Sequence, residues 1–331
     1  MSKEEKIFPL RESTRLGVRI ACKKTEALDI CSLELRPLEG QSLPAFAAGA
    51  HIDVHLPGGL VRPYSLCNDC AEPDRYVIAV LRESASRGGS AAVHEQLQTG
   101  QQLSISAPRN HFALDAQACK HLLLAGGIGI TPMLAMARCL AREGADFALH
   151  YCARTRERMA FADAIESAPW AHQAHLYVDD EHNRPQLQLA ALLEQASPDT
   201  HLYVCGPKGF MDAVLGAAEA AGWPQERLHW ECFAGEVVHH DEDQSFEVEL
   251  ASTGEVVCVA AGQTVVQALE SIGVCVPTSC EQGVCGTCLT RVLAGEPDHR
   301  DMYLTEEERA ANDQFTPCCS RARSARLVLD L

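Results

Sequence analysis

Residues 280–288 read CEQGVCGTC and place three cysteines at a C-x4-C-x2-C spacing. Two more, Cys318 and Cys319, follow near the end of the chain. Three close thiols and one remote thiol have the ligand spacing of a [2Fe–2S] cluster, since a curled loop can bring several thiolates to one iron–sulfur core. The glycines at positions 283 and 286 would let the loop backbone approach the sulfides closely. We therefore predict that Cys280, Cys285 and Cys288 are cluster ligands.

The fourth ligand is Cys318 or Cys319. The module resembles the plant-type ferredoxins, and the separation of 30 residues between Cys288 and Cys318 matches their pattern, so the resemblance implies Cys318. A zinc site is the alternative, but this spacing lacks the paired knuckles typical of zinc. Cys67 and Cys70 also form a C-x2-C pair, but no second pair lies near them in the sequence, and we expect no metal there.

The end of the chain is unusually acidic. Residues 236–331 hold 17 acidic and 6 basic side chains and no lysine, and the whole chain of 331 residues has a net charge of −17. Such a surface repels phosphate backbones and anionic lipids, which argues against nucleic-acid and membrane roles. The compositional break predicts a separate module whose partner presents positive charge. His239 and His240 lie at this break and are expected in a solvated linker rather than at a metal.

Residues 121–133, HLLLAGGIGITPM, read as a buried strand, a glycine-rich turn and a helix start. Residues 201–214, HLYVCGPKGFMDAV, repeat this order, and further buried strands are expected at 146–155 and 175–181. The alternation of strands and helices predicts a parallel α/β sheet with helices on both faces. Ligands of such sheets bind at the carboxyl ends of the strands, where glycines allow a pyrophosphate to approach the backbone.

Before this region, residues 15–112 alternate short apolar runs with Gly, Pro and Asp, which predicts a compact β unit interrupted by one helix at 89–97. It contains Arg62-Pro-Tyr64-Ser65, where the arginine can neutralise a phosphate, the tyrosine can pack on a flat ring and the serine can donate a hydrogen bond. A helix start at Gly88-Gly89-Ser90 offers a second anion site.

These motifs resemble known ones. GGIGITPM and CGPKGFMDAV resemble the nicotinamide domain of the ferredoxin–NADP reductase superfamily, and R-x-Y-S resembles its flavin motif. The order of the modules is similar to that of the phthalate dioxygenase reductase family, which includes vanillate demethylase reductases. The resemblance implies a multi-domain protein with an antiparallel β-barrel flavin domain (1–114), an α/β parallel-sheet NAD-binding domain (115–235), a linker (236–244) and an α+β ferredoxin domain of the β-grasp type (245–331).

The resemblance also implies roles for single residues. Hydride transfer is expected beside Ser65, Thr131 and Cys205. The flavin is FMN, and its contacts are expected at Arg62, Tyr64, Ser65, Arg82, Gly88, Gly89, Ser90 and the aromatic Phe233. The contacts of the dinucleotide are expected at Gly127, Gly129, Thr131, Pro132, Arg154, Asp179, Cys205 and Gly206. Asp179 and Asp180 would bind ribose hydroxyls and repel a 2′-phosphate, which favours NADH. The positive charges of Arg154, Arg156 and Arg158 would instead attract a 2′-phosphate, which favours NADPH.

We expect an enzyme, because a hydride carries two electrons, a [2Fe–2S] cluster takes one at a time, and a flavin bridges the two. The resemblance implies an NADH-dependent reductase that delivers single electrons to a terminal oxygenase, of the Rieske non-haem iron type. Alternatives are another acceptor, such as a haem monooxygenase or a soluble ferredoxin, and a redox-sensing role. The charged N-terminus lacks the apolar region of a signal peptide, so the 16 cysteines are expected to be reduced thiols in a cytoplasmic protein, which we expect to be a monomer.

Overall fold

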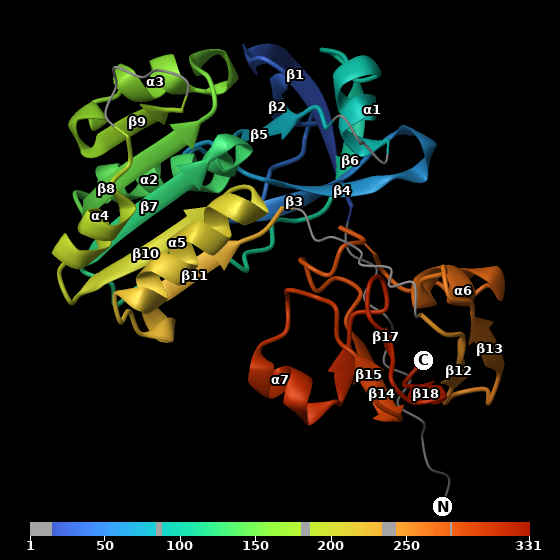
Figure 1. Ribbon diagram of the computed structural model, residues 1–331. Coiled ribbons are helices and arrows are strands. Elements are labelled where there is room, and N and C mark those ends of the chain that lie inside the picture. The colour runs from blue at the N-terminus through green and yellow to red at the C-terminus, as the bar shows by residue number, and fades with distance from the viewer. Residues whose placement is uncertain (1–14, 84–87, 180–185, 234–242, 279) are drawn as a thin grey trace, which may run out of the picture.

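The computed structural model describes residues 15–83, 88–179, 186–233, 243–278 and 280–331. Figure 1 shows three bodies in chain order, one coloured blue to teal, one green to yellow and one orange to red. Each body is built around its own sheet, and the first and third bodies lie next to each other. This arrangement agrees with the expected flavin, NAD and ferredoxin domains. The part of the predicted linker from 236 to 242, with His239 and His240, lies outside the described residues.

The first sheet has six strands in the order β4-β3-β6-β1-β2-β5, and all its pairs are antiparallel. Its elements are β1 (Leu16–Ala27), β2 (Ile30–Pro37), β3 (His51–His55), η1 (Pro57–Gly59), β4 (Val61–Ser65), β5 (Tyr76–Leu81), α1 (Gly89–Glu95) and β6 (Gln102–Ile105). An isolated bridge between Leu66 and Ile78 joins the end of β4 to β5, the two outer strands of that order. Val18 and Ile20 alternate with exposed or half-buried neighbours on β1, as expected for a strand with one face in the core.

The second sheet is entirely parallel, with five strands in the order β11-β10-β7-β8-β9. Its strands are β7 (Lys120–Gly126), β8 (Asp146–Ala153), β9 (Ala174–Val178), β10 (Thr200–Cys205) and β11 (Leu228–Glu231). The helices are η2 (Gly127–Gly129), α2 (Ile130–Glu143), η3 (Arg156–Arg158), α3 (Ala162–Glu166), η4 (Ala171–Gln173), α4 (Leu189–Gln195), α5 (Lys208–Ala220) and η5 (Gln225–Arg227).

Helices cover both faces of this sheet, as predicted (Figure 1). Leu123 and Ala125 of β7 pack with α2, whereas Leu122 and Leu124 of the same strand pack with α4 and α5. Alternate side chains of a strand point to opposite faces, so one apolar run serves both layers. The short strand β11 was not predicted, because its sequence, LHWE, is too short and too polar to be distinguished from a loop.

The third sheet is mixed, with the order β13-β12-β18-β14-β16 and a separate β15-β17 pair. Its elements are β12 (Phe246–Leu250), β13 (Val256–Val259), α6 (Val265–Ser271), β14 (Thr290–Ala294), β15 (Pro297–Asp298), α7 (Glu306–Ala311), β16 (Gln314–Phe315), β17 (Arg321–Ala322) and β18 (Arg326–Leu329). Both helices begin with a capping box, in which Thr264 and Thr305 accept hydrogen bonds from the third helical residue. No helix in the described part of the chain has the length and apolar character needed to cross a membrane.

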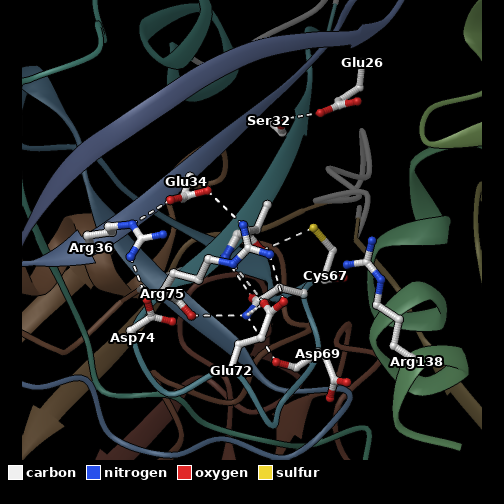
Figure 2. Close-up of polar contacts among 12 residues, drawn as sticks. Glu26, Ser32, Glu34, Arg36, Cys67, Asp69, Glu72, Asp74, Arg75 and Arg138 are labelled. Carbon is white, nitrogen blue, oxygen red and sulfur yellow. Dashed lines mark hydrogen bonds and ion pairs between the residues drawn. The ribbon is translucent and has the colours of Figure 1, made fainter. Parts of the chain in front are cut away.

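The Cys67–Cys70 segment lies where the first domain meets the second (Figure 2). The Cys67 thiol donates to the Val77 carbonyl at 3.3 Å, and the Cys67 carbonyl accepts from Arg138 of α2 at 2.7 Å. Beside it, Arg75 forms ion pairs with Glu34 and Glu72. Cys67 therefore belongs to a hydrogen-bonded contact between the two domains.

Candidate active site between three domains

A cavity of about 760 Å³ lies at the junction of the three domains. Its lining includes Arg62, Tyr64, Ser65, Gly89 and Ser90 from the first domain, Thr131 and Phe233 from the second, and Cys280 and Cys285 from the third. All nine are residues that the sequence singled out. A volume of this size is in the range of small-molecule and cofactor sites. The fold thus brings the expected flavin, nicotinamide and cluster residues to one space.

The hydroxyl of Ser65, at the end of β4, donates a hydrogen bond to Oε2 of Glu231 at 3.2 Å. Glu231 ends β11, and Cys205 lies beside it at the end of β10. Burial raises the pKa of Glu231 to about 8, and the bond from Ser65 offsets only part of this effect. Burial likewise raises the pKa of the Cys205 thiol well above its usual value. The site therefore holds a carboxyl group that is neutral near pH 7 beside two predicted catalytic residues. Glu231 was missed because β11 was not recognised.

The phosphate end of the expected flavin site is formed by the start of α1. A Cβ atom on Gly89 would lie 2.7 Å from Cγ of Arg62, so the arginine packs directly on the helix start. Gly88, with a φ of 90°, precedes the helix in the left-handed region, which glycine adopts readily. Ser90 accepts a hydrogen bond from the Glu83 amide at 3.1 Å. Arg82 pairs with Glu95 at 2.6 Å, and its contact with the flavin stays a prediction.

His51 is a further cavity residue that the sequence did not single out. It is buried, and among the described residues its Nε2 atom has no hydrogen-bond partner. Burial, followed by the charge of Arg109, lowers the pKa of His51 to about 4, so the ring is neutral. A buried polar atom without a partner facing a cavity is what a bound polar ligand is expected to satisfy. The cavity therefore fits a ligand with both ring and phosphate groups, as a flavin mononucleotide has.

The two glycine-rich turns of the second domain pack closely against each other, and the Phe210 side chain lies against both. A Cβ atom on Gly129 would collide with the backbone carbonyl of Cys205, and one on Gly206 would lie 3.0 Å from Cα of Gly126. Gly127 lies at the same turn with a positive φ of 54°. Thr131 is buried and donates to the Ile128 carbonyl at 3.0 Å. Bare backbone at the carboxyl ends of β7 and β10 is the arrangement that admits a pyrophosphate.

Two predicted adenosine-side residues follow neighbouring strands. Arg154 comes directly after β8, Asp179 directly after β9, and both are exposed. Arg156 pairs with Glu166 at 2.7 Å and Arg158 with Asp29 at 3.1 Å, so both of these arginines are already engaged within the protein. Because both side chains are already paired, they give less support to the binding of a 2′-phosphate. Pro132 is buried in the first turn of α2. Asp180 lies outside the described residues.

The cysteine loop is curled as its glycines predicted. Glu281, Gly283 and Gly286 all have positive φ angles, of 58°, 71° and 65°. The amides of Gln282 and Val284 donate to the Cys280 sulfur, each at 3.4 Å. Amides directed at sulfur are the interactions that stabilise a cluster-bound thiolate and tune its potential.

Four buried thiols converge at this loop. The Cys280 thiol interacts with those of Cys285 and Cys318, and the Cys318 thiol also interacts with that of Cys288. The adjacent Cys319 thiol interacts with that of Cys318, and its sulfur lies 3.3 Å from the Thr316 hydroxyl. An all-thiolate set of four fits an iron–sulfur cluster, and the geometry favours Cys318 over Cys319 as the fourth ligand.

Two contacts connect the cavity to the cysteine loop. Arg62 pairs with Glu281 of the loop at 3.2 Å. The His111 ring, beside His51, meets the Tyr303 ring edge-on at 5.9 Å, and Tyr303 covers Gly286. Because Cys280 and Cys285 also line the cavity, the predicted cluster site lies directly beside it, which suits electron transfer between them.

Comparisons with known proteins agree with this architecture. A family model described as a 2Fe-2S iron-sulfur cluster binding domain matches residues 248–323, and one for the N-terminal domain of dimethylamine monooxygenase subunit DmmA-like proteins matches residues 104–228. The chain is 53% identical over 316 residues to the vanillate O-demethylase oxidoreductase of Pseudomonas sp. (strain HR199 / DSM 7063), an alignment that covers 96% of this chain and 100% of the relative.

Solved structures give the same result. The structure of phthalate dioxygenase reductase, described as modular for electron transfer from pyridine nucleotides to [2Fe-2S], is 41% identical and covers 97% of this chain and 99% of its own, with a TM-score of 0.77. An intact type IV self-sufficient cytochrome P450 monooxygenase is 39% identical over 96% of this chain and 41% of its own, with a TM-score of 0.82.

Proposed function

This chain belongs to the phthalate dioxygenase reductase family, which includes the vanillate O-demethylase oxidoreductases, and on that premise we propose how its domains divide the chemistry. It is an NADH-dependent oxidoreductase with FMN and a [2Fe–2S] cluster, and it serves as the reductase component of a multicomponent oxygenase. The flavin supplies the step between two-electron hydride chemistry and one-electron cluster chemistry.

In our assignment, the six-stranded sheet closes as the flavin barrel in residues 1–114, and residues 115–235 bind NADH. Residues 245–331 form a ferredoxin domain of the β-grasp type, after a linker at 236–244. These boundaries are supported by the connections between β6 and β7 and between β11 and β12, in which the described residues form no helix or strand. Arg62, Gly88, Gly89 and Ser90 hold the FMN phosphate, while Tyr64 and Phe233 contact its ring.

Ser65, Thr131 and Cys205 surround the place of hydride transfer in this assignment. The Ser65 hydroxyl donates its hydrogen to Glu231, which positions it, so its oxygen can accept a hydrogen bond at the reacting edge of the ring. The bare turns at Gly127, Gly129 and Gly206 admit the pyrophosphate, and Asp179 binds the adenosine ribose. The observation that carries the function is the single cavity lined by Ser65, Thr131, Cys280 and Cys285, because donor, carrier and acceptor residues share it.

The visible absorption spectrum of the purified protein, before and after anaerobic addition of NADH, tests this function. We expect flavin absorption bands at about 450 nm together with broad iron–sulfur absorbance, and we expect NADH to bleach both. Flavin bands without the cluster signature would contradict the assignment of the four cysteines. Both cofactors present but unbleached by NADH would contradict the assignment of the donor.

We propose a Rieske-type oxygenase as the electron acceptor, docked on the acidic ferredoxin domain. The first turn of α7 supports a cationic partner surface, because Glu306, Glu307 and Glu308 follow one another there. Electron transfer to the partner should then weaken as the salt concentration rises, whereas reduction of the internal cofactors by NADH should not. Salt-independent transfer to the partner would contradict this docking mode.

A haem protein is the second candidate acceptor, since a self-sufficient cytochrome P450 monooxygenase contains a region with the same architecture. Parallel stopped-flow reduction of a Rieske oxygenase and of a haem monooxygenase distinguishes the two acceptors. We also propose that the protein works as a monomer in the cytoplasm. Light scattering of the holoprotein and fractionation of its native cells test these two points.

A further inference from the structure

A second polar cluster lies away from the predicted cofactor residues, at the amino-terminal ends of β10 and β11. Nδ1 of His201 is 2.9 Å from Nε2 of His229, and the two rings are nearly parallel, with an interplanar angle of 13°. Oδ2 of Asp115 lies 4.0 Å from Nδ1 of His201. The three possible ligand atoms all lie within 4.8 Å of one another.

The cluster is held in place by its surroundings. The amide of Asp115 donates to the Tyr203 hydroxyl at 2.8 Å, and its Oδ1 atom accepts from the Gln117 amide at 2.7 Å, which leaves Oδ2 toward His201. Tyr203 stacks on His229 with 4.5 Å between ring centroids. Within the described ranges, no lysine or arginine pairs with the Asp115 carboxylate. The negative charge therefore faces two imidazole rings and no permanent cation.

We propose that Asp115, His201 and His229 form a binding site for a divalent transition-metal ion, with Zn²⁺ as its representative. Two imidazole nitrogens and one carboxylate oxygen are a ligand set that zinc uses in proteins, with a fourth position left for water. Bonds of about 2.0–2.1 Å in a tetrahedral site place ligand atoms about 3.4 Å apart. Two separations, 2.9 and 4.0 Å, lie on either side of this value, and the third, between Asp115 and His229, is at most 4.8 Å. Rotation of the rings and of the half-exposed carboxylate would bring all three ligand atoms to one ion.

A metal ion binds the neutral form of an imidazole ring through its lone pair. Binding requires both facing nitrogens to be free of hydrogen, so the proton of the present His201–His229 bond moves to the outer nitrogen of its own ring. No net proton release is needed when both rings are neutral.

The ion would join three segments: the connection before β7, the strand β10 and the edge strand β11. β11 carries Glu231 two residues beyond His229, so the ion would stabilise the strand that positions this carboxyl. A ligand that binds only the folded state raises the free energy of unfolding, and this increase grows with the logarithm of the ligand concentration once the site is saturated. None of the three ligands is a residue assigned above to FMN or NADH, although His229 also lines the cavity between the domains.

Zn²⁺ titration of the chelator-washed holoprotein, in competition with a chromophoric chelator, tests the site. We expect wild type to bind one more equivalent of Zn²⁺ than His201→Gln. Asp115→Asn should bind that equivalent at least tenfold more weakly than wild type. His175→Gln is the matched control, because His175 also stacks on a histidine of the same sheet, His150, at 4.8 Å, and it should bind as wild type does. Exposed thiols contribute equally to all four proteins.

Thermal unfolding gives a second readout. Zn²⁺ should raise the melting temperature of wild type and His175→Gln but not that of His201→Gln. NADH-dependent ferricyanide reduction and an unchanged visible spectrum verify that each variant keeps its cofactors. Equal zinc stoichiometry, affinity and thermal shift in wild type and Asp115→Asn would overturn the proposal, even if His201→Gln does not fold.

Discussion

The hydroxyl of Ser65 donates to Oε2 of Glu231 across 3.2 Å, although the two residues are 166 positions apart in the chain. This bond joins the last residue of β4 to the last residue of β11, and so joins the flavin domain to the NAD domain. A buried neutral carboxyl thus holds the serine that is expected at the reacting edge of the flavin.

Glu231→Gln is expected to change how stability depends on pH. The carboxyl titrates near pH 4.5 when unfolded and near 8 when folded, so in wild type the unfolded state loses its proton first and stability falls as pH rises from 4.5 to 8. Gln does not titrate, and the variant should gain stability relative to wild type across this window, by up to about 4 kcal/mol. Melting temperatures at pH 5, 6.5 and 8 measure this. A constant difference between the two proteins would show that Glu231 is ionised when buried.

Cys318→Ala and Cys319→Ala are a matched pair of adjacent substitutions. The first removes a thiol that interacts with Cys280 and Cys288, and the second removes one that contacts Thr316. We expect the electron paramagnetic resonance signal of the reduced cluster to be lost in Cys318→Ala and kept in Cys319→Ala. The opposite outcome would assign the fourth ligand to Cys319.

Arg62→Ala should weaken FMN binding about 10- to 100-fold, because it removes a charge-assisted contact to phosphate worth about 1.5–3 kcal/mol. Glu281→Gln should have the opposite effect and strengthen FMN binding several-fold, because the carboxylate that pairs with Arg62 is neutralised. Recovery of flavin fluorescence on dilution measures both affinities. Arg156→Ala, which breaks a pair with Glu166 in the NAD domain, is the control. Weaker FMN binding in Glu281→Gln would rule out competition for Arg62.

Asp179→Asn should raise the ratio of kcat/KM for NADPH to that for NADH by about tenfold, because an exposed carboxylate no longer repels the 2′-phosphate. Steady-state ferricyanide reduction with each nucleotide measures the ratio. Arg158→Ala, which removes a side chain paired with Asp29, should leave the ratio unchanged. A larger change in Arg158→Ala than in Asp179→Asn would place the 2′ position at the arginines.

Gly129→Ala should destabilise the NAD domain by about 1–3 kcal/mol and weaken NADH binding, because the new methyl group collides with the Cys205 carbonyl. Gly209→Ala is the control: nothing lies within 4 Å of its Cβ position, and alanine favours the helix α5. Thermal unfolding and NADH titration compare the two variants. Equal NADH affinity in both would show that the turn tolerates a side chain.

Local patterns account for most of what the sequence predicted. The cysteine spacing, the glycine-rich turns and the apolar runs are each contained in a few consecutive residues, and β7, β8, β9 and β10 occur where strands were expected. Glu231 and His51 were not predicted, because burial and a missing partner arise only when distant segments pack together. The pairing of Arg82 with Glu95 could not be predicted either, because these residues lie in different segments of the chain.

The Arg62–Glu281 pair also has a consequence for assembly. One guanidinium is shared between the predicted phosphate site of the first domain and the cysteine loop of the third. Binding of FMN and docking of the ferredoxin domain then compete for the same guanidinium, so each weakens the other. Thermodynamic reciprocity requires the factor to be the same in both directions. The apoprotein should hold its ferredoxin domain most tightly, and loading with FMN should release it toward the partner.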